Sequence, residues 1–127
     1  MPASDKPKPT EAELQILATL WRRGPSTVRQ VHDALRARTG YTSVLKLMQI
    51  MAEKGLVTRE TAERSHVYRA AQAEAQTQRR LAADLMQRAF GGSARKLIAA
   101  ALSSRRATPA ELDEIRQLLD DMKGDAS

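Results

Sequence analysis

The sequence predicts a mainly α-helical fold that carries one small β-hairpin. The composition favours helix, because Ala, Leu, Arg and Glu are abundant and only 3% of the 127 residues are aromatic. Apolar residues recur at helical spacing in several segments between residues 10 and 123. Residues 56–69 differ, since they are typical of two short strands joined by a polar connection. Helix, turn, helix and then a hairpin is the order of a winged helix-turn-helix domain, so we predict this domain followed by a helical region.

The first helix is predicted to begin at Thr10, because Thr10 and Glu13 have the spacing of a capping box. Leu14 and Leu17 follow on one face. Trp21 continues that face, and we expect it to anchor the core rather than stack on a ligand. Gly24-Pro25 should end the helix.

A second helix is predicted to open at Ser26-Thr27, with Gln30 three residues after Thr27. Thr39-Gly40 should end it with a short turn that suits a helix-turn-helix. Its expected buried stripe consists of Val28, Val31 and Leu35.

The segment YTSVLKLMQIMAEKGLV, residues 41–57, is the predicted recognition helix. It places Val44, Met48 and Met51 on one apolar stripe. The opposite side carries hydroxyl, amide and ammonium groups, the types that read base edges and bind phosphates in a major groove. Any amphipathic helix has two such faces, so the order of the neighbouring elements carries the interpretation. The expected DNA contacts of this helix are Thr42, Ser43, Lys46, Gln49, Ile50 and Lys54.

The limits of this helix and of the hairpin follow from local signals. Thr42 is expected to cap the helix, and Lys54-Gly55 to end it, with Gly55 in the left-handed conformation. Residues 56–60 and 66–69 are the predicted strands, connected by residues 61–65. Arg64, near the tip, is expected to reach the DNA backbone or a minor groove; the alternative is an ordinary exposed arginine.

Charge and cysteine content narrow the function. The net charge is +6 and the isoelectric point about 10.2. Residues 1–70 carry 12 basic and 7 acidic side chains, a net of +5, whereas residues 71–127 carry 9 and 8, a net of +1. The excess lies with the recognition helix, as DNA binding requires, although a solvated basic surface has the same composition. The lack of cysteine excludes disulfides, thiolate metal sites and a cysteine nucleophile.

Residues 73–123 are predicted to form three more helices. The first runs to about Phe90 and Gly91-Gly92, the second is capped by Ser93, and the third opens with a capping box at Thr108. These helices are too short to enclose a core, so we expect them to pack against a second copy of the chain. The expected dimerisation residues are Leu81, Leu85, Phe90, Leu97, Ile98, Leu102, Leu112, Ile115, Leu118, Leu119 and Met122.

The predicted organisation has four segments. These are a disordered arm (1–9), a winged helix-turn-helix domain (10–72), a helical dimerisation domain (73–123) and a tail (124–127). No apolar stretch is long enough to insert into a membrane, and the N-terminus lacks the apolar run of a signal peptide. A soluble, cytoplasmic protein is expected.

The motifs together resemble the BlaI/MecI/CopY family of bacterial winged-helix repressors. The likeness rests on PTEAELQILATLW (Pro9–Trp21), YTSVLKLMQIMAEKGLV (Tyr41–Val57), HVYRA (His66–Ala70) and TPAELDEIRQLLDDM (Thr108–Met122). It implies a homodimer with one winged helix on each half of a palindromic double-stranded DNA operator and a C-terminal dimerisation domain.

The resemblance also implies a way to relieve repression. In the better-known members, a membrane-bound sensor metalloprotease signals and the repressor is cut in its dimerisation domain. The matching bond lies near Ala100-Ala101, where three alanines replace an Asn-Phe pair. The copper-responsive members carry a cysteine-rich motif that this cysteine-free chain lacks.

Two positions of the recognition helix depart from the family pattern. Lys46 stands where Thr is usual and Ile50 where Arg is usual. Lys46 suits a guanine edge or a phosphate, and Ile50 suits a thymine methyl group. The operator is therefore expected to differ from the family's best-known one.

Two other functions remain compatible with the sequence. A winged helix can dock a protein instead of DNA, and a small-molecule effector could bind at the dimer junction. Binding that weakens steeply with salt would favour DNA.

An enzyme is not expected. His32 and His66 have no nucleophile or metal-ligand set beside them, and the neighbouring carboxylates Asp120 and Asp121 diverge on a helix. No catalytic residue, metal or cofactor is predicted.

Overall fold

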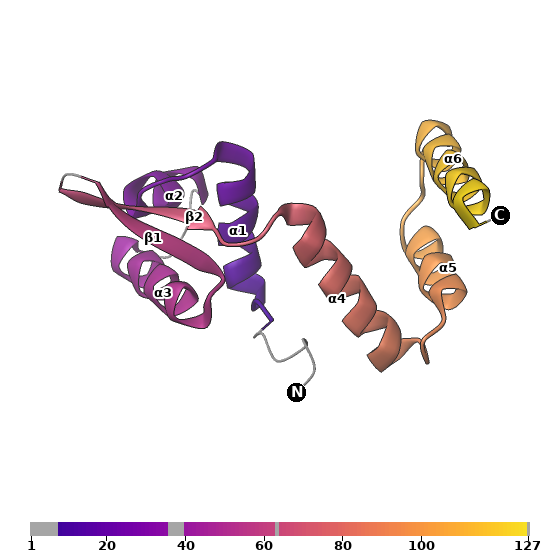
Figure 1. The fold of residues 1–127 in the computed structure, drawn as a ribbon, viewed down its shortest axis with the longest axis horizontal. Coiled ribbons are helices and arrows are strands. Elements are labelled where there is room, and N and C mark those ends of the chain that lie inside the picture. The colour runs from indigo at the N-terminus through magenta and orange to yellow at the C-terminus, as the bar shows by residue number, and fades with distance from the viewer. Residues whose placement is uncertain (1–7, 36–39, 63, 127) are drawn as a thin grey trace. The chain divides into compact units, whose positions relative to one another are not determined.

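The computed structural model describes residues 8–35, 40–62 and 64–126, which form six helices and one two-stranded antiparallel sheet (Figure 1). The prediction of a mainly helical fold with a small hairpin is confirmed. Most of the expected disordered arm, and Thr39 at the expected end of the second helix, lie outside the described residues. The elements are α1 (Glu11–Arg23), α2 (Val28–Leu35), α3 (Tyr41–Lys54), β1 (Val57–Ala62), β2 (Ser65–Ala70), α4 (Glu74–Ala89), α5 (Ala94–Ser104) and α6 (Pro109–Ala126).

The chain divides into two compact units between Ala82 and Ala83, inside α4. The start of α4 belongs to the N-terminal unit, where Thr77 is buried and the Gln72 carbonyl accepts a 3.0 Å hydrogen bond from Trp21 Nε1. The functional boundary expected at residues 72–73 stays a prediction.

Helix α1 begins as the sequence predicts. The Thr10 backbone N–H donates to Glu13 Oε1 (2.8 Å), and the Glu13 N–H donates to Thr10 Oγ1 (3.2 Å), so the capping box is confirmed. Gly24 ends the helix with a φ of 88°, which favours glycine. Trp21 is half-buried and packs against the core, as predicted. Tyr68 is the large aromatic residue that is fully buried.

Helix α2 begins at Val28, and the capping pair of Thr27 and Gln30 is present with hydrogen bonds of 2.9 and 3.2 Å. Ser26 does not open the helix, contrary to prediction. Its backbone pairs instead with Tyr68, since the Ser26 N–H donates to the Tyr68 carbonyl (2.9 Å) and the Tyr68 N–H donates back (2.8 Å). Ser26, two residues before α2, therefore adds one isolated bridge to β2.

Of the two predicted ends of α3, the C-terminal one is confirmed and the N-terminal one was wrong. Gly40, in extended conformation, is the N-cap, and Thr42 lies inside the first turn rather than capping it. The C-terminal end is confirmed, because Gly55 adopts the left-handed conformation and the Leu56 N–H donates to the Met51 carbonyl at 2.9 Å.

The hairpin is longer than predicted. Thr61 pairs with His66 and Ala62 with Ser65, so residues expected in the connection extend the ladder, while Leu56 precedes the first strand. The wing tip projects beyond the three helices (Figure 1). Because side chains alternate along a strand, Tyr68 and His66 share the inner face, whereas Arg69 lies on the outer face.

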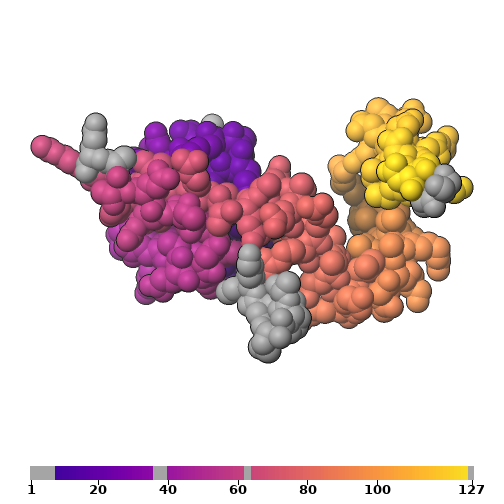
Figure 2. Space-filling view, in the orientation of Figure 1, coloured from indigo at the N-terminus to yellow at the C-terminus, as the bar shows by residue number. Residues whose placement is uncertain are grey.

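The core of the N-terminal unit fixes the orientation of α3. Val44, Met48 and Met51 are buried, as predicted, and Tyr68 is buried with them. Their partners in the core are Ile16, Leu17, Leu20, Val28, Val31 and Val57, from all the other elements of the domain. The space-filling view shows these elements closed into one body with the wing at its end (Figure 2). The opposite face of α3 must therefore point to solvent.

Candidate nucleic-acid interface

The exposed face of α3 is the candidate interface. With the apolar stripe buried, the 100° step of a helix turns the predicted contact residues outward. Thr42, Ser43, Lys46 and Gln49 are exposed, and Ile50 is half-exposed beside them. The structure thus brings five of the predicted side chains onto one surface, which we call the reading face.

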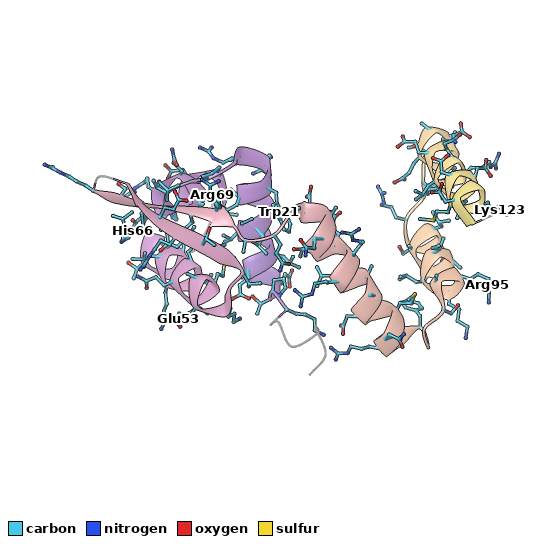
Figure 3. All side chains as sticks on the ribbon, viewed as in Figure 1. Trp21, Glu53, His66, Arg69, Arg95 and Lys123 are labelled. Carbon is cyan, nitrogen blue, oxygen red and sulfur yellow. The ribbon has the colours of Figure 1, made fainter. Side chains whose placement is uncertain are left out.

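Glu53 belongs to the reading face although it was not predicted. It is exposed one turn after Gln49 and is labelled near the end of α3 in Figure 3. Glu53 and Gln49 also line a groove against β1, together with Arg59. A carboxylate repels phosphates but accepts a hydrogen bond from a cytosine amino group, so it favours base reading over backbone binding.

Lys54 does not join the reading face. Its ammonium lies 2.9 Å from Glu13 Oε2 and 3.1 Å from Glu13 Oε1, and Glu13 is almost fully buried on α1. Lys54 therefore ties the end of α3 to α1, and its predicted DNA contact is withdrawn. The pair was missed because the two residues are 41 positions apart.

The Glu13 carboxyl is electrostatically tuned. Burial raises its pKa, but hydrogen bonds from Thr10 and the ammonium of Lys54 outweigh burial and hold the pKa below its usual value. The charged form is therefore favoured in the folded protein, which makes the capping box and the ion pair one network.

The start of α3 carries a second group that sequence reasoning missed. The Arg29 guanidinium lies 4.6 Å from the centre of the Tyr41 ring, a cation–π geometry. The His32 ring approaches Tyr41 edge-on at 6.2 Å. In the sequence, the only sign of this group was that Tyr41 stands at the first position of the predicted recognition helix.

The wing adds further polar groups. Arg64 is exposed in the turn between β1 and β2, and His66 (Figure 3) lies on β2 with its Nδ1 3.2 Å from Thr61 Oγ1. On the outer face, Arg69 pairs with Glu60 at 3.8 Å. Of the predicted residues, Arg64 thus lies apart from the reading face but in the same unit.

The C-terminal unit presents apolar surface. All fully buried apolar residues of the described chain lie between Ile16 and Tyr68, so α5 and α6 contain none. Of the predicted dimerisation residues, Leu81 lies in the N-terminal unit and is half-buried. Phe90, Leu97, Leu102 and Ile115, in the C-terminal unit, are half-buried as well. The other six are exposed, from 42% for Ile98 and Leu112 to 58% for Met122, and include Leu85, Leu118 and Leu119.

Ala100 and Ala101, the expected cleavage position, lie inside α5, where Ala101 is exposed. None of the helices in the described ranges is both long and apolar enough to cross a membrane.

The three-helix scaffold, the hairpin and the outward polar face of its third helix define a winged helix-turn-helix protein. The pattern of the penicillinase repressor family matches residues 9–121, and the chain belongs to that family. The resemblance to BlaI and its relatives is confirmed at this level. The family consists of transcription regulators rather than enzymes.

Two relatives agree with this assignment, and a solved structure shares the fold. The transcriptional regulator BlaI of Mycobacterium tuberculosis, from strains CDC 1551 / Oshkosh and ATCC 25618 / H37Rv, is 43% identical over 61 residues, covering 46% of this chain and 44% of the relative. The match therefore spans less than half of the length of these relatives. The fold resembles the transcriptional regulator Tm0710 from Thermotoga maritima, with a TM-score of 0.51, 17% identity and coverage of 91% of this chain and 74% of that chain.

The network of Glu13 predicts a pH dependence of stability. Because its pKa is lowered from the ordinary 4.5, its contribution is present at neutral pH and is lost as the pH falls through the lowered value. Glu13→Gln should lower the free energy of unfolding by about 2 kcal/mol at pH 7, and the difference should shrink below about pH 4.5.

Urea unfolding at several pH values measures this difference. Glu11→Gln, at an exposed position in the same turn of α1, is the matched control and should change the free energy by less than about 0.5 kcal/mol. A Glu13→Gln difference that stays constant down to pH 3 would contradict the assigned network.

Proposed function

We propose that this chain represses transcription by binding a palindromic DNA operator as a homodimer. The observation that carries the proposal is the orientation of α3, which buries Met48 and exposes Lys46 and Gln49. A helix held this way on a compact support presents its polar side chains to a major groove. Family membership supports the same conclusion.

The reading face contains groups for base recognition. The amide of Gln49 can form two hydrogen bonds with an adenine, Lys46 can donate to a guanine edge or a phosphate, and Ile50 can pack on a thymine methyl group. Thr42 and Ser43, in the first turn of α3, can donate to a backbone phosphate. Each good base contact contributes about 1–3 kcal/mol of discrimination, so one helix discriminates only modestly.

Two copies solve this problem by binding two half-sites. Once one half is bound, the second half-site binds at a high effective concentration. The exposed leucines of α6, Leu118 and Leu119, supply apolar surface that a second copy can cover. Loosening this contact should therefore abolish tight operator binding while leaving each winged helix folded.

Selection of bound duplexes from random DNA tests the DNA-binding part. Full-length protein should enrich one palindromic sequence, and Gln49→Ala should bind it about 5-fold to 150-fold more weakly, with no such loss on a scrambled duplex. Gln15→Ala, at an exposed position of α1, is the control and should bind like the wild type. If the selection enriches no sequence at all, neither a palindrome nor any other, the proposal is contradicted.

The dimer is tested in the full chain by Leu118→Glu combined with Leu119→Glu. Analytical ultracentrifugation should report a monomer, and operator affinity should fall by a factor of about 100 or more. Arg116→Glu reverses a charge at an exposed position of the same helix and should leave the dimer intact. Truncation after residue 72 is a poorer test, because it removes Thr77, which is buried in the N-terminal unit.

Relief of repression by proteolysis is the third part of the proposal, with a membrane-bound sensor metalloprotease as partner. The bond between Ala100 and Ala101 lies within α5, so cutting requires this helix to open locally. Mass spectrometry of the chain from induced cells should detect fragments 1–100 and 101–127. An intact chain in cells where the operator has been released would contradict this part.

A further inference from the structure

A cavity of about 230 Å³ opens between the start of α2, the start of α3 and the wing. We call it the wing cavity and define it by Thr27, Arg29, Tyr41, Arg64 and His66, which line it. The three elements are far apart in the sequence, so the cavity exists only in the folded domain. None of these residues except Arg64 belongs to the DNA contacts expected from the sequence.

The wing cavity is basic. Arg29, Arg64 and His66 line it, and its described lining residues include no carboxylate. The groove between α3 and β1 is different, because a carboxylate, Glu53, lines it together with Arg59. The wing cavity is thus the one of these two hollows whose charge suits an anion.

The Arg29 guanidinium is held in place rather than free. It lies over the Tyr41 ring at 4.6 Å, and within the described chain it has no acidic partner. Stacking on an aromatic face orients the planar guanidinium and leaves its N–H donors at the edge available. Such a preoriented fork matches the oxygens of a phosphate.

Two other features of the wall fit an oxyanion. The N-terminal end of α2 attracts negative charge. The capping pair occupies the Thr27 and Gln30 amides, which leaves those of Val28 and Arg29. Arg64, from the wing, also lines the cavity. A helix terminus and two arginines thus meet in one cavity.

We propose that the wing cavity binds one phosphate group, supplied by the DNA backbone next to the bases that α3 reads. This inference rests on the proposed function and assigns a binding role to Arg29 and Tyr41. Tyr41 directly precedes Thr42 and Ser43 of the reading face, so a phosphate in the cavity lies beside the contacted bases. A free phosphate shares the same chemistry, and the experiment separates the two sources.

The first measurement is the salt dependence of duplex binding by full-length Arg29→Gln and Arg64→Gln. Each dimer would lose two phosphate contacts, so the slope of log affinity against log salt should become shallower by about 2. The ratio of wild-type to variant affinity should then shrink about tenfold between 50 and 200 mM salt. The loss should be equal on the selected and on a scrambled duplex, since phosphates carry no base identity.

Arg69→Gln is the matched control, because it removes the same charge from the outer face of the same hairpin. It should keep the wild-type slope. Tyr41→Phe should also keep it, since the ring beneath Arg29 remains, whereas Tyr41→Leu should weaken binding on both duplexes. Circular dichroism verifies that each variant is folded. Arg29→Gln and Arg64→Gln that behave like Arg69→Gln would overturn the proposal.

The source of the phosphate is identified with duplexes that carry a neutral methylphosphonate at one backbone position. At one backbone position beside the half-site, the methylphosphonate should weaken duplex binding by the wild type. The same substitution should not weaken duplex binding by Arg29→Gln any further. This coupling would support a phosphate from the DNA backbone. Without such coupling, inorganic phosphate is added to the DNA-free protein at constant ionic strength. Shifts of the Arg29 and Tyr41 resonances would then support the phosphate site with a free phosphate as its ligand. If neither the coupling nor the resonance shifts are observed, the proposal is overturned.

Failure of this inference differs from failure of the proposed function. If only the wing cavity is misassigned, Gln49→Ala still loses affinity on the selected duplex while Arg29→Gln binds like Arg69→Gln. If the repressor proposal is wrong, no duplex is selected and Gln49→Ala has no effect.

Discussion

The burial of one apolar stripe on α3 is the constraint on which the other features depend. Val44, Met48 and Met51 pack against α1, α2 and Tyr68, and a helix that turns 100° per residue cannot bury this stripe without exposing Lys46 and Gln49. The two ends of α3 reinforce this orientation. Lys54 binds the buried carboxylate of Glu13 at one end, and Tyr41 contacts Arg29 at the other. The same contacts that stabilise the domain therefore aim its reading face.

The C-terminal unit differs from the N-terminal unit in how it places its apolar side chains. Its helices leave large apolar side chains exposed, among them Leu118 and Met122, because α5 and α6 have no described core to bury them in. Such surface is costly in water and is stabilised by a partner. In the proposed repressor, assembly and function are thus separated within the chain: one unit is complete and reads DNA, and the other is completed by its copy.

The sequence predicted what depends on local chemistry. Capping residues such as Thr10, the left-handed Gly55 and the periodicity of Met48 act within one turn, and all are confirmed. The predictions that were wrong depend on distant partners. Ser26 resembles a helix cap until Tyr68 pairs with its backbone, and Lys54 resembles a DNA contact until folding brings Glu13 beside it. Likewise, Thr61 and Ser65 are polar enough for the predicted connection, but they pair in the ladder with His66 and Ala62. No local pattern encodes such pairs.

The reading face itself suggests why cations are needed elsewhere. Among the described residues of this face, Lys46 is the only basic one, and the negative charge of Glu53 offsets its positive charge. The face therefore has little net electrostatic attraction for phosphates. Ile50, half-exposed on the same face, adds no charge. Electrostatic attraction to the backbone supplies most of the sequence-independent affinity for DNA, and in this chain it must come from beside the helix. Arg29 and Arg64 in the wing cavity are placed to supply it. In the proposed repressor, α3 therefore identifies the bases while the start of α2 and the wing hold the DNA backbone, so different residues encode specificity and affinity.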